Sequence, residues 1–179
     1  IGLTLIFGVT RIVNFAHGEF LMLAMYLTFW LNNLQGVDPY LSPLLVVPLL
    51  FLAGLAAHCL VIQPILGAPS YMQIFATVGL SVTLQNMALF LWKADFRSVE
   101  SFCSSSAIRV VSLICGVPKL IAFAASVLIT AALHLFLKRT YLGKAIRAVV
   151  QNREAAQLMG IDIYRIYLLA FGLGTACVG

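Results

Sequence analysis

The sequence predicts an all-α fold, a polytopic helical membrane protein with about six spans, and three observations lead to this class. Of the 179 residues, 62% are hydrophobic and only 9% are charged, whereas about 25% of the residues of an ordinary soluble domain are charged. Three of the apolar runs are close to 20 residues long, the length at which an α-helix crosses a bilayer. These runs lack the alternation of apolar and polar residues that is typical of a membrane β-barrel.

The apolar runs are separated by short connections rich in turn-forming residues. In chain order they cover residues 2–13, 20–34, 44–62, 72–92, 120–137 and a stretch from 166 onward. The third run carries Pro48, which a membrane helix tolerates. We expect residues 1–179 to form one transmembrane domain. Because the sequence starts at Ile1 and stops within an apolar run, we also expect a longer protein, truncated here at both ends.

The distribution of Lys and Arg predicts the orientation of these spans. The segment 138–165, after the fifth run, holds six basic residues, and loops rich in Lys and Arg remain on the cytoplasmic side. Alternation then places the loop between residues 93 and 119 outside the cell and the break at 14–19 near the inner surface. The net charge of +5 does not indicate a nucleic-acid partner, because the basic residues concentrate in this one segment.

A cluster of polar residues interrupts the first apolar stretch. Without it, residues 2–34 would make a helix of about 50 Å, too long for a hydrocarbon core of about 30 Å. Asn14 is expected to cap the second helix, and Glu19 to lie in its first turn. A second interpretation is that Asn14, His17 and Glu19 line a pathway through the membrane or its inner gate, because ionisable groups in membrane segments are costly and usually functional. The two interpretations are compatible.

A polar stripe runs along the fourth apolar run. Gln73, Thr77, Ser81 and Gln85 recur every four residues, so they lie on one face of a helix, and Asn86 flanks this face. Such a stripe faces a pore or another helix rather than lipid. Both alternatives remain open from the sequence.

The predicted outer loop contains Cys103 and Cys115. Residues 108–113 are rich in β-branched side chains and are expected to form one strand of a hairpin. A disulfide between the two cysteines would stabilise the loop, whereas two cysteines alone do not make a disulfide framework. Both a disulfide and two free thiols remain open.

The basic segment 138–165 contains a predicted short surface helix. Asn152 can cap a helix that starts at Arg153, Glu154 suits its first turn, and Gly160 can end it after Met159. From these local signals, an ordinary solvated loop and a helix that docks on a partner are both possible.

No catalytic, metal or cofactor site is expected. The sequence has no Ser/His/Asp or Cys/His arrangement, no phosphate-binding G-x-x-x-x-G-K-[ST] motif, and no convincing metal-ligand spacing. His58 and His134 are isolated in apolar runs and are interpreted as structural histidines whose hydrogen bonds are satisfied.

Two stretches, "GLTLIFGVTRIVNFAHGEFLMLAMYL" and "LGKAIRAVVQNREAAQLMGIDIYRI", resemble the permease subunit of branched-chain amino acid ABC importers. "TVGLSVTLQNMALFLW" is similar to the family's next characteristic helix. "EAAQLMG" resembles the EAA-x3-G core by which many importer permeases dock on their ATPase, and the residues that carry it here are Arg153, Glu154, Ala155, Ala156 and Gly160.

The resemblance implies a multi-pass permease domain in the cell inner (plasma) membrane that translocates Leu, Ile and Val and is not itself an enzyme. It also implies partners: two ABC ATPase subunits that hydrolyse ATP, a second permease subunit, an extracytoplasmic solute-binding protein and the lipid bilayer. Two alternatives differ in substrate or mechanism. One is a related permease for urea or short amides, and the other is a secondary transporter that uses His17 and Glu19 as a relay. A third, a membrane-embedded enzyme, would use the same pair.

Overall fold

The structure is a computed structural model that describes residues 2–93, 107–110 and 113–179. The first half of the chain forms α1 (Gly2–Thr10), α2 (His17–Gln35), α3 (Pro43–Ala57), the π-helix η1 (His58–Ile62), α4 (Gln63–Ile65) and α5 (Ser70–Trp92). The second half forms β1 (Ala107–Val110), β2 (Leu113–Gly116), α6 (Val117–Arg139), α7 (Tyr141–Gln151), α8 (Arg153–Leu158) and α9 (Ile163–Ala176).

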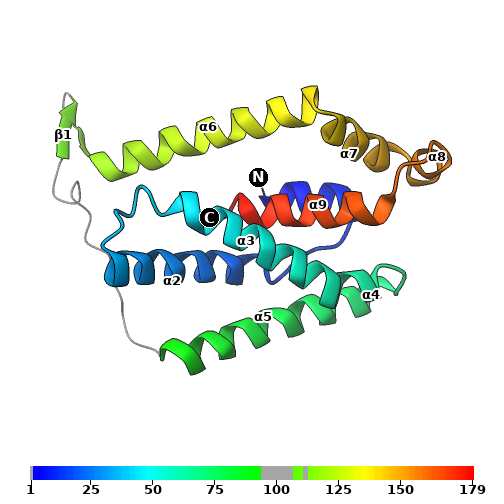
Figure 1. The fold of residues 1–179 in the computed structure, drawn as a ribbon, viewed down its shortest axis with the longest axis horizontal. Coiled ribbons are helices and arrows are strands. Elements are labelled where there is room, and N and C mark those ends of the chain that lie inside the picture. Colours follow the sequence, from blue (N-terminus) through cyan, green and yellow to red (C-terminus); the bar gives the residue numbers. More distant parts are fainter. Residues whose placement is uncertain (1, 94–106, 111–112) are drawn as a thin grey trace.

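The long helices run back and forth along the longest dimension of the molecule (Figure 1). The hairpin lies at one end, and α4, α7 and α8 lie at the opposite end (Figure 1). This arrangement agrees with the predicted alternation, in which the loop that contains the hairpin and the basic segment lie on opposite sides of the membrane.

Three helices are long and apolar enough to cross a membrane among the residues that the structure describes: Pro43–Ile65, Ser70–Trp92 and Pro118–Arg139. They coincide with the predicted runs at 44–62, 72–92 and 120–137. α1 and α9 are shorter than a bilayer requires, and α2 has 19 residues but is less apolar. The described part of the chain is therefore a largely helical membrane protein with three candidate spans.

The predicted hairpin is present, but its strands differ from the prediction. β1 and β2 pair antiparallel, with Ala107 opposite Gly116 and Val110 opposite Leu113. The prediction of one continuous strand over 108–113 is therefore wrong, because Val110 and Leu113 belong to two strands that pair with each other. Cys103 lies outside the described residues. The structure therefore does not test the Cys103–Cys115 disulfide.

A π-turn joins α3 to α4. The amide of Gln63 donates to the carbonyl of His58, five residues earlier. The next residue is Pro64, which has no amide hydrogen and whose ring clashes with the carbonyl four residues before it. Widening the helix by one residue relieves this conflict, and π-turns of this kind recur at functional sites.

Small residues let α9 pack closely on α1 and α3. The backbone of Gly2 approaches the carbonyl of Gly174 so closely that a β-carbon on Gly2 would collide with it, and Gly54 lies directly against the side chain of Thr175. One turn earlier in α9, the ring of Phe171 packs edge-on against Phe20, with 6.4 Å between centroids. α9 is thus the central helix onto which the α1–α2 break and α3 are packed.

Candidate functional site

The break between α1 and α2 is an ordered turn held by local hydrogen bonds. Arg11 adopts a left-handed backbone (φ 57°) that ends α1, and its amide donates to the carbonyl of Phe7 at 2.8 Å. The side-chain oxygen of Asn14 accepts from the amide of Ala16 at 3.1 Å. The prediction that Asn14 caps α2 is wrong, because the capping position is Ala16 and no side chain caps that helix. Asn14 instead stabilises the turn that precedes it.

The polar stripe of α5 fixes this break in place. The hydroxyl of Ser81 donates to the Glu19 carboxyl oxygen at 2.9 Å. The hydroxyl of Thr77, which is fully buried, lies 3.2 Å from the carbonyl of Val13 and 3.0 Å from that of Ile74, to which it donates in a bifurcated arrangement. Two sets of residues that the sequence singled out separately therefore meet in space.

This contact lies deep along α5. Ser81 comes eleven residues after the helix starts at Ser70, so at 1.5 Å per residue it lies about 16 Å from that end of a helix about 34 Å long. The partner of Ser81, Glu19, is therefore near the middle of a candidate span. This geometry favours a discontinuity at membrane depth over a turn at the inner surface, and irregular backbone at that depth must be buried in protein or line a cavity.

The other residues of the stripe have different surroundings. The amide nitrogen of Gln73 donates to the carbonyls of Ile65 and Ala68, at 3.2 and 3.0 Å, and so closes the turn after α4. Gln85 and Asn86 are exposed, and Asn86 donates to the carbonyl of Val82 in its own helix. Gln73, Thr77 and Ser81 thus make contacts within the protein, and the exposed surface of the stripe begins at Gln85.

Several buried nitrogens near the break have no hydrogen-bond partner among the described residues. They are Nδ2 of Asn14, Nδ1 of His17, and both ring nitrogens of His58. His58 lies in the π-turn, and its ring centroid is 5.6 Å from that of Phe171. The interpretation of His58 as a satisfied structural histidine is therefore wrong. Buried polar groups are nearly always paired. These unpaired nitrogens are therefore not explained by packing alone and indicate an unusually polar region of the interior.

The short helix α8 has the predicted start and end. The side chain of Asn152 accepts from the amide of Ala155 at 3.0 Å, and Glu154 lies in the first turn. Gly160 has φ 80°, and the amides of Gly160 and Ile161 donate to the carbonyls of Gln157 and Ala156. This pair of bonds is the Schellman arrangement that ends a helix at a left-handed glycine.

α8 is attached by one face and exposed on the other. Ala156 is buried in a cluster with residues of α1, α7 and α9, so the second alanine of the motif is the position where a larger side chain would not fit. Arg153, Glu154 and Ala155 are exposed. Leu158 and Met159 are also exposed, at 89% and 83%, which is a large apolar area to leave uncovered on a polar loop.

Comparison with known proteins identifies the family. The model of the family described as branched-chain amino acid transport system / permease component matches residues 1–179. The chain belongs to this family. Since the chain carries three candidate spans, this family places it in the cell inner membrane as a multi-pass protein.

Named members of this family resemble the chain over almost all of its length. The high-affinity branched-chain amino acid transport system permease protein BraD of Pseudomonas aeruginosa is 27% identical over 195 residues, which cover 98% of this chain and 61% of BraD. LivH of Salmonella typhimurium is 26% identical, with the same coverage. A probable branched-chain amino acid transport permease protein LivH of Methanocaldococcus jannaschii is 28% identical over 100% of this chain and 58% of its own length.

The chain therefore spans about three fifths of the length of these family members. No solved structure matches it.

Sequence reasoning missed two features of the site, one that depends on a distant contact and one that is local. The bond between Ser81 and Glu19 joins positions 62 residues apart, and no local signal pairs them. The π-turn at His58 had a signal in the chain, because Pro64, two residues after the third apolar run, removes a donor from the helix and forces a local change.

We predict that Ser81→Ala destabilises the folded chain. It removes the hydrogen bond to the carboxyl of Glu19, and bonds of this kind contribute about 1.5 kcal/mol. Ser126→Ala is the matched control, because Ser126 is exposed and donates to a carbonyl of its own helix at 2.8 Å. Chemical unfolding in mixed micelles measures the stability of both variants. Equal midpoints for the two variants would show that the contact between α2 and α5 contributes nothing.

Proposed function

We propose that this chain is the membrane-spanning permease subunit of an ATP-binding-cassette importer that carries Leu, Ile and Val across the inner membrane. The observation that carries the proposal is α8, a capped and glycine-terminated helix that is anchored by Ala156 and otherwise exposed. A helix presented in this way on a basic loop suits a docking role rather than catalysis. The names of the family members supply the substrate class.

In this proposal, residues 1–179 are one permease domain with about six spans, and 138–165 is its cytoplasmic loop. α8 docks on ATPase subunits, which hydrolyse ATP, and Arg153, Glu154, Ala155, Ala156 and Gly160 shape the contact. A second permease subunit completes the pathway, and an extracytoplasmic binding protein delivers the solute. The chain itself needs no cofactor.

Tight contacts link α8 to the polar break. Ala156 belongs to the same buried cluster as Ile166 and Ala170 of α9, and α9 is in close contact with α1 at Gly174 and Gly2. α1 leads into the break that α5 holds. A movement of α8 on nucleotide binding would therefore be passed on by rigid contacts, because closely packed helices shift as bodies rather than deform.

In this proposal, the solute pathway runs alongside the break between α1 and α2. Asn14, His17 and Glu19 form its polar wall at membrane depth, and Ser81 holds Glu19. Gln73 and Thr77 support the wall from α5, and Gln85 and Asn86 continue the polar stripe away from it. Breaking the link between Ser81 and Glu19 would change the access of solute without affecting the docking helix.

Uptake by the complete complex in proteoliposomes tests this function. We expect ATP-dependent accumulation of labelled Leu, Ile and Val, and none of labelled urea, when the binding protein is present. Accumulation of urea alone would assign the chain to the related amide importers. Accumulation that follows a proton gradient and ignores ATP would support the secondary-transporter alternative instead.

A further inference from the structure

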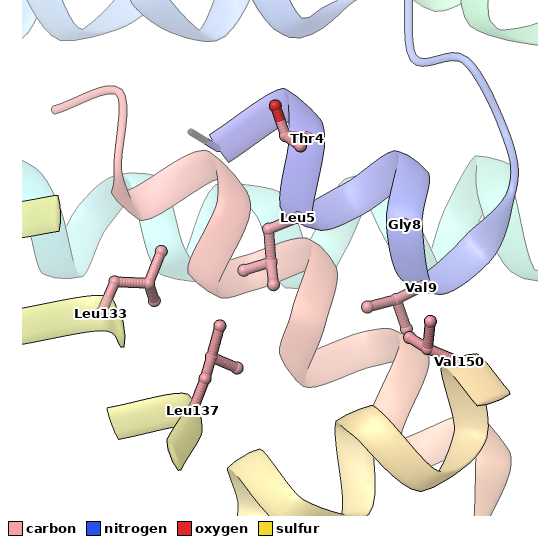
Figure 2. A pocket seen from close by; sticks show the side chains of 7 residues that line it. All are labelled: Thr4, Leu5, Gly8, Val9, Leu133, Leu137 and Val150. Carbon is pink, nitrogen blue, oxygen red and sulfur yellow. The ribbon is translucent and has the colours of Figure 1, made fainter. Parts of the chain in front are cut away.

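Two adjoining cavities lie between α1 and the start of the basic segment. An apolar groove of about 430 Å³ is lined by α1, by Leu133 and Leu137 of α6, and by Val150 of α7. Figure 2 shows Leu133 and Leu137 facing Leu5 of α1. A second cavity of about 360 Å³ is lined by the break after α1, the junction of α7 with α8, and Tyr167. The two cavities share Val9 and Val150 in their walls, so they are direct neighbours.

The second cavity carries positive charge. Arg11 and Arg153 both line it, together with one acidic residue, Glu154. The guanidinium of Arg153 lies 5.6 Å from the ring centroid of Tyr167, a cation–π contact that holds it at the cavity. Within the described residues, neither Arg11 nor Arg153 forms a salt bridge, and with one acidic residue against two basic ones the lining of the cavity keeps an excess of one positive charge.

The backbone at Arg11 also indicates a specific role for its side chain. Arg11 is one of two non-glycine residues with positive φ among those described. A left-handed conformation costs a residue with a β-carbon about 1 kcal/mol or more, and such residues concentrate at binding and active sites. Here the conformation ends α1 at a residue that lines the polar cavity.

We propose that the two cavities together bind one anionic phospholipid. Its phosphate lies between Arg11 and Arg153, and one acyl chain lies in the groove between α1 and α6. The charge of one cavity, the apolar wall of the other and their shared boundary match the two parts of such a lipid. Basic pockets between spanning helices on the cytoplasmic side are known to take anionic headgroups.

The surroundings of the groove fit an acyl chain better than a soluble anion. α6 is a candidate span whose most apolar window has none of its residues buried within the chain, so its groove face lies at the depth of lipid. The polar cavity is beside α7 and α8, at the end that the Lys and Arg pattern assigns to the cytoplasm. A lipid seated here would bridge α1 to α6, whose main contacts within the described residues are with α7 and β2.

Native mass spectrometry of the assembled transporter, with phosphatidylglycerol or phosphatidylcholine added, tests this site. We expect phosphatidylglycerol to bind more tightly than phosphatidylcholine. Arg11→Asn and Arg153→Gln should each weaken the binding of phosphatidylglycerol about fivefold, the effect of one basic residue beside an anionic lipid. Asparagine suits position 11 because it tolerates positive φ. Gly8→Leu should fill the groove and exclude the lipid, since a β-carbon on Gly8 has no neighbour within 4 Å. Arg147→Gln, outside both cavities, is the control.

The same assay separates a lipid from a free anion. Glycerol phosphate, which has the headgroup charge and no acyl chain, should not compete with phosphatidylglycerol at equal concentration. Equal binding of the two phospholipids, or equal effects of Arg147→Gln and Arg11→Asn, would overturn the proposal. Full competition by glycerol phosphate, together with unchanged binding to the Gly8→Leu variant, would indicate that the site takes a soluble anion. This result would also overturn the proposal. None of these outcomes depends on the transported solute.

Discussion

Gly54→Ala should destabilise the chain by about 2 kcal/mol, although alanine usually stabilises a helix relative to glycine by about 1 kcal/mol. The new β-carbon would meet the side chain of Thr175, colliding with its hydroxyl oxygen and lying 3.0 Å from its β-carbon and 3.1 Å from its methyl group. Thr175 has little freedom to move away. It is fully buried, and its hydroxyl is 2.9 Å from the carbonyl of Gly172 and 3.2 Å from that of Leu50.

A double-mutant cycle tests whether this collision is the cause. Thr175→Ala removes both the hydroxyl and the methyl group, so the pair Gly54→Ala with Thr175→Ala should be more stable than the sum of the single changes predicts. Gly79→Ala is the matched control, because Gly79 is also inside a long helix but has nothing within 4 Å of its would-be β-carbon. We expect Gly79→Ala to be neutral or stabilising. A loss of stability at Gly79 equal to that at Gly54 would mean that backbone effects, and not α3–α9 packing, decide the result.

Features that depend on neighbours in the chain could be predicted from the sequence. The cap at Asn152 and the end at Gly160 follow from the chemistry of one side chain and one backbone conformation. The long spans follow from their apolar length, and the structure places α5 within two residues of the predicted run. These features need no knowledge of how the helices pack.

The polar site could be predicted only as separate parts. The sequence indicated Glu19 and Ser81 as functional candidates, but their contact depends on how α2 and α5 pack. Asn14 carries a side chain typical of a helix cap, yet it supports the turn before α2, because it accepts from the amide of Ala16 and the helix begins only after that residue. His58 lies in the π-turn next to Pro64, and its ring nitrogens have no hydrogen-bond partner among the described residues, which the apolar pattern of the run did not indicate.

The docking role of α8 predicts a loss of ATPase binding when its exposed apolar surface is removed. Leu158→Ser should weaken the ATPase affinity of the purified permease about tenfold or more, because burying a leucine side chain contributes about 1.5–3 kcal/mol. The change should not unfold the chain, since Leu158 is 89% exposed and α8 is anchored instead by Ala156.

Leu142→Ser in α7 is the control for this prediction, because it makes the same change in the same basic segment at a position that is less exposed, at 39%. Glu154→Lys should reduce transport in the same assembled complex, since it reverses the charge in the first turn of α8. Surface plasmon resonance with immobilised permease in nanodiscs measures the affinity, and the rate of ATP hydrolysis per solute imported measures the coupling. If Leu158→Ser and Leu142→Ser bind the ATPase equally well and Glu154→Lys transports normally, α8 is an ordinary solvated helix. The movement of α9 would then have to start at another contact.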